Sequence, residues 1–165
     1  MVAKHLIIFI LFYFFAVLQN SFFVHFNLFG AVPNLVFILF CLVVFYEDKK
    51  SYIQLIAYSI LAGLLLDFYL QTYFGTSIVL LLVLGFCIKK STLMLQERRD
   101  DKFPIIYFLP LFIVSLMVYD LAVGSTGGLI AKIIYNLVAG AVAFYLYKKF
   151  ISANVEDRQL KLFRK

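Results

Sequence analysis

The side chains that could do chemistry in this chain are a few charged groups inside long apolar segments. Asp67, Asp120 and Lys132 each lie within a few residues of the end of such a segment. An ionisable side chain inside an apolar span costs about 2.5–3.5 kcal/mol on membrane-insertion scales, so it usually marks a function or a fixed ionic partner. We therefore expect these residues to belong to a polar site that packed helices position.

Two segments repeat one pattern of small and polar residues at a spacing of four. The members are Ser59, Gly63, Asp67 and Gln71 in the first segment, and Gly128, Lys132, Asn136 and Gly140 in the second. Residues four apart lie on one face of an α-helix. Inside a membrane, small and polar residues are typical of the faces at which helices pack together. Each segment is therefore predicted to pack its polar face against other helices.

The composition indicates a membrane protein. Of the 165 residues, 64% are hydrophobic and 15% are charged, whereas a soluble domain carries about 45–50% apolar and about 25% charged residues. We predict an all-α integral membrane protein with a single domain of six transmembrane helices. The expected spans are approximately 6–24, 33–46, 52–70, 74–88, 103–123 and 129–147, followed by a basic tail at 148–165.

The distribution of Lys and Arg predicts the orientation of these spans. A cytoplasmic N-terminus places Lys4, the pair at 49–50, the loop at 89–102 and the tail on one side, and these segments hold 14 of the 15 Lys and Arg residues. Cytoplasmic loops of membrane proteins are enriched in Lys and Arg. Both termini are therefore expected in the cytoplasm, where the basic segments face anionic lipid headgroups and not nucleic acid.

This topology brings polar residues from several spans into the outer half of the membrane. The expected cluster contains Gln19, Asn34, Asp67, Asp120, Lys132 and Asn136. Three interpretations are open. In the first, Lys132 pairs with Asp120 or Asp67 while the other polar groups join helices by hydrogen bonds. In the second, the cluster binds a ligand or a partner's helix, and in the third the charged side chains extend to the membrane interface.

The sequence contains no recognisable catalytic or metal-binding arrangement. It has no Ser/His/Asp or Cys/His set, no paired Glu and no glycine-rich phosphate loop. Cys41 and Cys87 lie within apolar runs without metal-binding spacing, and His5 and His25 stand alone. We therefore expect no enzyme activity, no metal ion and no cofactor.

Three short motifs resemble those of the rod shape-determining protein MreD family. They are Leu18-Gln-Asn-Ser-Phe-Phe23, Gly30-Ala-Val-Pro-Asn-Leu35, and Gly63-Leu-Leu-Leu-Asp67 followed by Gly75. The family patterns are L-Q-x-S-F, G-x-x-P-D-L, and G-x-x-x-D followed by G. The resemblance covers most of residues 5–147. One residue departs from it, because Asn34 stands where the family usually has Asp.

The resemblance implies a non-enzymatic scaffold of the bacterial cell-elongation machinery, which controls rod shape and peptidoglycan synthesis, in the inner membrane. The implied direct partner is MreC, and the larger assembly includes the MreB filament, RodA and a penicillin-binding transpeptidase. The family also looks similar in fold to the substrate-binding membrane subunits of energy-coupling-factor transporters. A small-molecule transporter subunit is therefore the alternative, with its ligand held by Asp67, Lys132 and Asn136.

The motifs also carry expectations for single residues. Gly63 should permit close helix approach, Asp67 should anchor a polar contact, and Pro33 should open the second helix. Gly75 and Gly140 are expected at helix-packing positions. The sequence leaves open which surface binds MreC and whether the protein forms a homo-oligomer.

Overall fold

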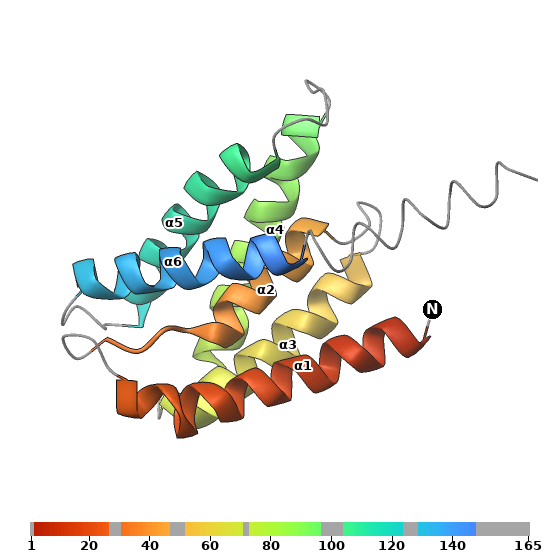
Figure 1. Cartoon of the computed structure of the whole chain (residues 1–165). Coiled ribbons are helices and arrows are strands. Elements are labelled where there is room, and N and C mark those ends of the chain that lie inside the picture. Colours follow the sequence, from red (N-terminus) through yellow and green to blue (C-terminus); the bar gives the residue numbers. More distant parts are fainter. Residues whose placement is uncertain are drawn as a thin grey trace, which may run out of the picture.

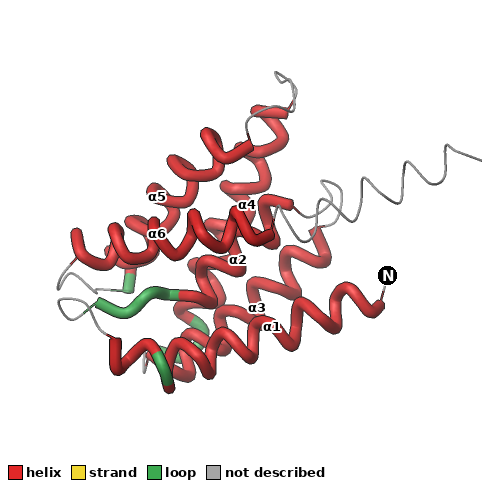
Figure 2. Tube along the Cα trace, in the orientation of Figure 1, coloured by secondary structure: helices red, strands yellow, loops and turns green. Residues whose placement is uncertain are grey.

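The computed structural model describes residues 2–26, 31–46, 52–70, 73–96, 104–123 and 129–147. These residues form six α-helices, one short 3-10 helix and no β-strand (Figure 1; Figure 2), so the all-α prediction is confirmed for them. The elements are α1 (Val2–Ser21), η1 (Phe23–Phe26), α2 (Leu35–Tyr46), α3 (Tyr52–Leu70), α4 (Thr76–Gln96), α5 (Pro104–Ala122) and α6 (Leu129–Tyr147).

Helix α2 is the centre of the bundle. It packs against α1, α3, α4 and α6, and Figure 1 shows it between α1 and α6. All of its residues from Val36 to Val44 are buried. A helix that is hydrophobic on every face is expected to be covered on every face. The uninterrupted apolar sequence of α2 therefore explains why the other helices surround it.

Aromatic rings fill the space between α2, α5 and α6. The Phe37 ring lies 5.1 Å from the Tyr119 ring, measured between centroids. Nearer the other end of α2, the Phe108 ring lies 5.2 Å from Phe45 and 5.1 Å from Phe144. Aromatic pairs at such distances contribute about 0.5–1.5 kcal/mol beyond the burial of their area. These contacts hold α5 and α6 against the central helix.

Helices α3 and α4 approach each other closely at Gly63. A Cβ atom added to Gly63 would lie 2.5 Å from the Cα and 2.6 Å from the N of Ile78. Because these are backbone atoms, a larger residue would force the two helices apart. Small residues at helix interfaces permit this kind of approach in membrane proteins.

Two further glycines face neighbouring side chains. A Cβ atom on Gly85 would lie 2.6 Å from Cδ1 of Leu55, and one on Gly140 would lie 3.1 Å from Cε1 of Phe112. Gly140 therefore accommodates an aromatic ring of α5 against α6. Gly85, which the sequence patterns did not single out, accommodates the Leu55 side chain of α3 against α4.

The helix boundaries follow the expected ranges closely at α3 and α6. These helices cover 52–70 and 129–147, which are the ranges expected for the third and sixth spans. Helix α5 covers 104–122, one residue shorter at each end than expected. Helix α1 begins at Val2 and ends at Ser21, before residue 24, and η1 follows it.

Helix α4 is about two turns longer than the range 74–88 that we expected for the fourth span. It begins at Thr76 and continues to Gln96, so the prediction of a loop beginning at Lys89 is wrong. Lys is a good helix former, and neither Gly nor Pro occurs between Lys89 and Pro104. A charge therefore ends the apolar run here without ending the helix. Residues 97–103 and the basic tail lie outside the described residues.

Helix α2 begins at Leu35, so the prediction that Pro33 opens this helix is wrong. Residues 31–34 precede it in a non-helical conformation, with Ala31 and Pro33 buried. The helix itself has 12 residues, which at 1.5 Å per residue is about 18 Å, well short of a hydrocarbon core about 30 Å thick. Non-helical backbone at membrane depth is tolerated where protein covers it or where it lines a cavity.

The exterior of the bundle is strongly apolar. Large exposed side chains include Ile53 on α3, Phe68 near the end of α3 and Ile130 on α6, which are 83%, 78% and 75% exposed. Soluble proteins rarely expose extensive contiguous apolar surface. Two described segments, Tyr52–Tyr69 and Thr76–Met94, are long and apolar enough to cross a membrane. The total of six spans stays a prediction.

Candidate functional site

Polar side chains gather at both ends of the bundle. The N-terminal end carries the start of α1 and the end of α4, and the opposite end, called the far end, carries the end of α1 and the start of α4 (Figure 1). The predicted cluster lies at the far end, where three arrangements can be distinguished: a capped turn, a capped helix start and a cavity.

Asp67 caps the first turn of α4. Its Oδ2 accepts a hydrogen bond from the Gly75 N–H at 2.6 Å, and its Oδ1 accepts one from the Ser77 N–H at 2.9 Å. The first N–H groups of a helix have no partner within the helix, and a carboxylate there is also favoured by the helix dipole. Gly75 has a φ of 97°, which a residue with a side chain rarely adopts. Asp67 thus stabilises the turn that joins α3 to α4.

The capped turn is connected to α5 through two hydroxyl groups. The Ser77 Oγ and the Tyr119 hydroxyl lie 2.9 Å apart and share a hydrogen bond. Tyr119 is only 1% exposed and also packs against Phe37 of α2. A buried hydroxyl needs a partner to offset its lost hydration. Ser77 supplies that partner and so fixes the end of α5 relative to the start of α4.

The start of α2 is capped by its own preceding residue and by α1. Asn34 Oδ1 accepts a hydrogen bond from the Phe37 N–H at 3.0 Å, which is the geometry of a helix N-cap. Gln19 Oε1 of α1 accepts one from the Val36 N–H at 3.4 Å. The Asn34 N–H in turn donates to Asn136 Oδ1 of α6 at 2.7 Å. Three segments far apart in the sequence therefore meet at this helix start.

Asn34 explains how the chain accommodates its departure from the motif. Asn and Asp are about equally favourable at an N-cap, because either side chain presents an oxygen to the free N–H groups. The amide oxygen of Asn34 makes the bond that a carboxylate oxygen would make. The neutral residue therefore retains the cap and omits only the charge.

A polar cavity of about 230 Å³ lies beside this capped helix start. Its walls come from the end of α1, η1, the segment at 31–34, the end of α5 and the start of α6. The lining residues are Gln19, Asn20, Val24, Val32, Asn34, Tyr119, Asp120, Val123, Lys132 and Asn136. The volume leaves room for several water molecules or a small polar group.

Asp120 differs from the other polar side chains of this cavity in its hydrogen bonding. It is 8% exposed, and its Oδ2 has no hydrogen-bond partner among the described residues. Lys132 acts electrostatically on the Asp120 carboxylate from the other side of the α5–α6 connection. The Asn136 Nδ2 instead donates to the Lys132 carbonyl oxygen at 2.9 Å. The cavity wall therefore combines a buried carboxylate oxygen that lacks a donor among the described residues with a positively charged side chain.

The structure separates one member of the predicted cluster from the others. Five of the six residues, Gln19, Asn34, Asp120, Lys132 and Asn136, line the cavity. Asp67 is not among the lining residues and is connected to this region through Ser77 and Tyr119. The sequence analysis missed both of these residues. Their positions in the sequence could have indicated them. Ser77 follows Gly75 by two residues at a helix start, and Tyr119 immediately precedes Asp120.

A second polar group at the N-terminal end was also missed. The Tyr58 hydroxyl lies 2.6 Å from His5 Nδ1, and Gln54 Nε2 lies 3.3 Å from His5 Nε2. His5 therefore links α1 to α3 by hydrogen bonds. The sequence analysis did not predict these bonds, because the partners of His5 lie 49 and 53 positions later in the sequence.

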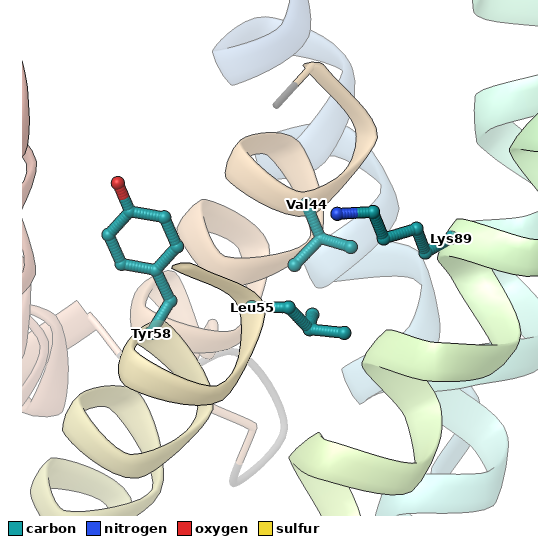
Figure 3. A pocket seen from close by; sticks show the side chains of 4 residues that line it. All are labelled: Val44, Leu55, Tyr58 and Lys89. Atoms are coloured by element: carbon teal, nitrogen blue, oxygen red, sulfur yellow. The ribbon is translucent and has the colours of Figure 1, made fainter. Parts of the chain in front are cut away.

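Lys89 is buried at this end, although we expected it in a cytoplasmic loop. It is 3% exposed, and its Nζ lies 4.8 Å from the centroid of the Tyr52 ring. Figure 3 shows its side chain beside Val44 and Leu55, while the Tyr58 hydroxyl points away from it. The space between these four residues does not admit a water molecule. The aliphatic stem packs on apolar neighbours and the ammonium group lies over an aromatic face, which makes this a packing contact.

Metal-ligand geometry is not found in the described part of the chain. No group of three or more His, Cys, Asp or Glu side chains in residues 2–26, 31–46, 52–70, 73–96, 104–123 and 129–147 could hold a metal ion. Cys41 is buried and Cys87 is exposed, and both are free thiols.

An apolar exterior, a buried central helix and internally bonded polar groups are typical of a helical-bundle membrane protein. The family model of the rod shape-determining protein MreD matches residues 1–152. The chain belongs to the MreD family, which confirms the resemblance seen in its motifs. The comparisons with curated proteins and with solved structures found no match. The likeness to energy-coupling-factor subunits therefore stays a prediction.

Proposed function

We propose that this protein is a non-enzymatic scaffold of the bacterial cell-elongation machinery that spans the inner membrane six times and binds MreC. The observation that carries the proposal is the family match over residues 1–152, which includes all six helices. Membership in this family assigns the protein a part in rod shape determination. MreB, RodA and a penicillin-binding transpeptidase are the proposed members of the larger assembly.

The use of the polar side chains supports a scaffold. Asp67 caps a turn, Asn34 and Gln19 cap the start of α2, and Ser77 joins α4 to α5. Most of the polar groups at the far end are thus occupied in holding helices together. Such bonds contribute about 0.6–2 kcal/mol each within a membrane. A rigid bundle with an apolar exterior is suited to binding the membrane helix of a partner.

Co-purification with MreC tests the proposal. The full chain and MreC would be co-expressed, solubilised in mild detergent and recovered through a tag on one of them. We expect a stable pair from the wild type and a weaker pair from Asp67→Ala, because this substitution removes both acceptors from the α3–α4 turn. Lys90→Gln, an exposed position on α4, is the matched control and should leave recovery unchanged.

The result should also appear in cells. Cells that depend on the Asp67→Ala variant are expected to lose rod shape while the protein still inserts in the membrane. Recovery of no MreC with the wild-type protein, in a preparation that shows a cooperative melting transition, would contradict the proposal. Unchanged MreC recovery and cell shape for Asp67→Ala would contradict the part assigned to Asp67.

The far-end cavity favours one alternative, a substrate-binding subunit of a small-molecule transporter. Its volume of about 230 Å³ suits a small molecule, and Asp120, Lys132 and Asn136 are the polar residues that would hold it. Asp67, which we expected among the ligands, does not line this cavity. Retention of a small molecule in native mass spectrometry, together with failure to recover MreC, would favour this alternative.

A further inference from the structure

The far-end cavity is lined by two side chains of opposite charge, Asp120 and Lys132. Asp120 is 8% exposed and its Oδ2 has no hydrogen-bond partner among the described residues. Lys132 lines the same cavity and acts electrostatically on that carboxylate. A lone anion would be repelled by Asp120, and a lone cation by Lys132. A molecule that carries both kinds of charge would be attracted by both residues.

Three amide oxygens in the cavity walls hold the surrounding helices together. The amide oxygens of Gln19, Asn34 and Asn136 each accept a backbone N–H group at the start of α2. These bonds fix α1, α2 and α6 around the cavity. Asp120 Oδ2 is left as a buried oxygen without a donor among the described residues, on a side chain that lines the cavity.

The position of the cavity also limits its ligand. Asp120 lies two residues before the last residue of α5, and Lys132 is the fourth residue of α6. Both are therefore near helix ends, at the depth where lipid headgroups meet the hydrocarbon core if these helices span the membrane. A compact charged group can enter at this depth without crossing the apolar interior.

We propose that the cavity binds a small zwitterion, with its ammonium group facing the Asp120 carboxylate and its phosphate or carboxylate group facing Lys132. Two sources can supply this chemistry. One is the headgroup of phosphatidylethanolamine, and the other is a free zwitterion such as an amino acid. The proposal does not depend on MreC binding, and MreC recovery measured on the same preparations tests the scaffold function separately.

Native mass spectrometry of the purified full chain tests the lipid source. The protein would be exposed to equal amounts of phosphatidylethanolamine and phosphatidylglycerol with the same acyl chains. We expect the wild type to retain phosphatidylethanolamine about tenfold better, and Asp120→Asn and Lys132→Gln each to lose about this factor, since each removes one charge-assisted contact. Lys90→Gln, which removes an exposed positive charge at the N-terminal end, should retain the preference.

Thermal unfolding of delipidated protein separates the two sources. O-phosphoethanolamine and glycine would be titrated in turn while the melting temperature is followed. A lipid preference with stabilisation by O-phosphoethanolamine identifies the headgroup. Stabilisation by glycine without a lipid preference identifies a free zwitterion.

Two results would overturn the proposal. One is a folded wild-type protein that retains both lipids equally and is stabilised by neither titrant. The other is a preference that persists in both Asp120→Asn and Lys132→Gln. The first result depends on the wild type alone, so it remains decisive even if a variant fails to fold.

Discussion

Asp67 and Asp120 occupy matching positions in the sequence and have opposite environments in the structure. Each lies within three residues of the last residue of its helix, α3 or α5. Both oxygens of Asp67 accept backbone N–H groups, whereas Asp120 Oδ2 accepts none from the described residues and borders a cavity. One carboxylate is therefore part of the framework, and the other belongs to the wall of a cavity. Substitutions should separate stability from binding accordingly.

The largest expected effect is that of Asp67→Ala on stability. The substitution leaves the Gly75 and Ser77 N–H groups without their acceptors, and we expect it to lower the free energy of unfolding by about 2–4 kcal/mol. Unfolding by titration with SDS from mild detergent would measure the change. Asp67→Asn, which keeps one acceptor oxygen, should cost less. Equal stability of Asp67→Ala and the wild type would show that the cap is dispensable.

Gly63→Ala tests the same hairpin by steric means. The added Cβ would lie 2.5 Å from the Ile78 Cα, and overpacking of this kind costs about 1–3 kcal/mol. The same SDS titration would detect the loss. The added Cβ would also lie 2.7 Å from the Ile78 Cγ1, but Ile78→Ala removes only this contact and should not restore stability while the backbone contacts remain. Restoration by that second substitution would place the conflict with the Ile78 side chain instead.

Asp120→Asn should have a much smaller effect on stability than Asp67→Ala. Asp120 Oδ2 accepts no hydrogen bond from the described residues, and the cavity that Asp120 and Lys132 line leaves room for water. We expect a change below about 1 kcal/mol in the SDS titration. A loss as large as that of Asp67→Ala would show that the Asp120–Lys132 interaction is structural, and the contrast between the two carboxylates would disappear.

The ranges of α3 and α6 could be predicted from sequence because polar residues bound both apolar runs. The end of α4 could not, since Lys89 ends the apolar run but is compatible with a helix whose packing buries it. The site shows the same limit. Depth along a span is nearly the same for Asp67 and Asp120, so a one-dimensional pattern groups them. The two residues differ in the groups that surround them in three dimensions, and these depend on the packing of the whole bundle.

Asn34→Asp is expected to produce the smallest change in stability. It affects both the cap at the start of α2 and the far-end cavity. The substitution restores the residue that the family motif usually has, at a position where either oxygen caps α2 through the Phe37 N–H. Attraction of the new charge to the helix dipole is worth about 0.3–1 kcal/mol, but the charge also enters the cavity that contains Asp120. The two effects oppose each other, so stability should change by less than about 0.5 kcal/mol in the SDS titration. A zwitterion bound in the cavity would then meet two carboxylates, and retention of phosphatidylethanolamine over phosphatidylglycerol should increase. A loss of stability above about 2 kcal/mol would show that the neutral amide is required beside Asp120 and that the two acidic positions exclude each other.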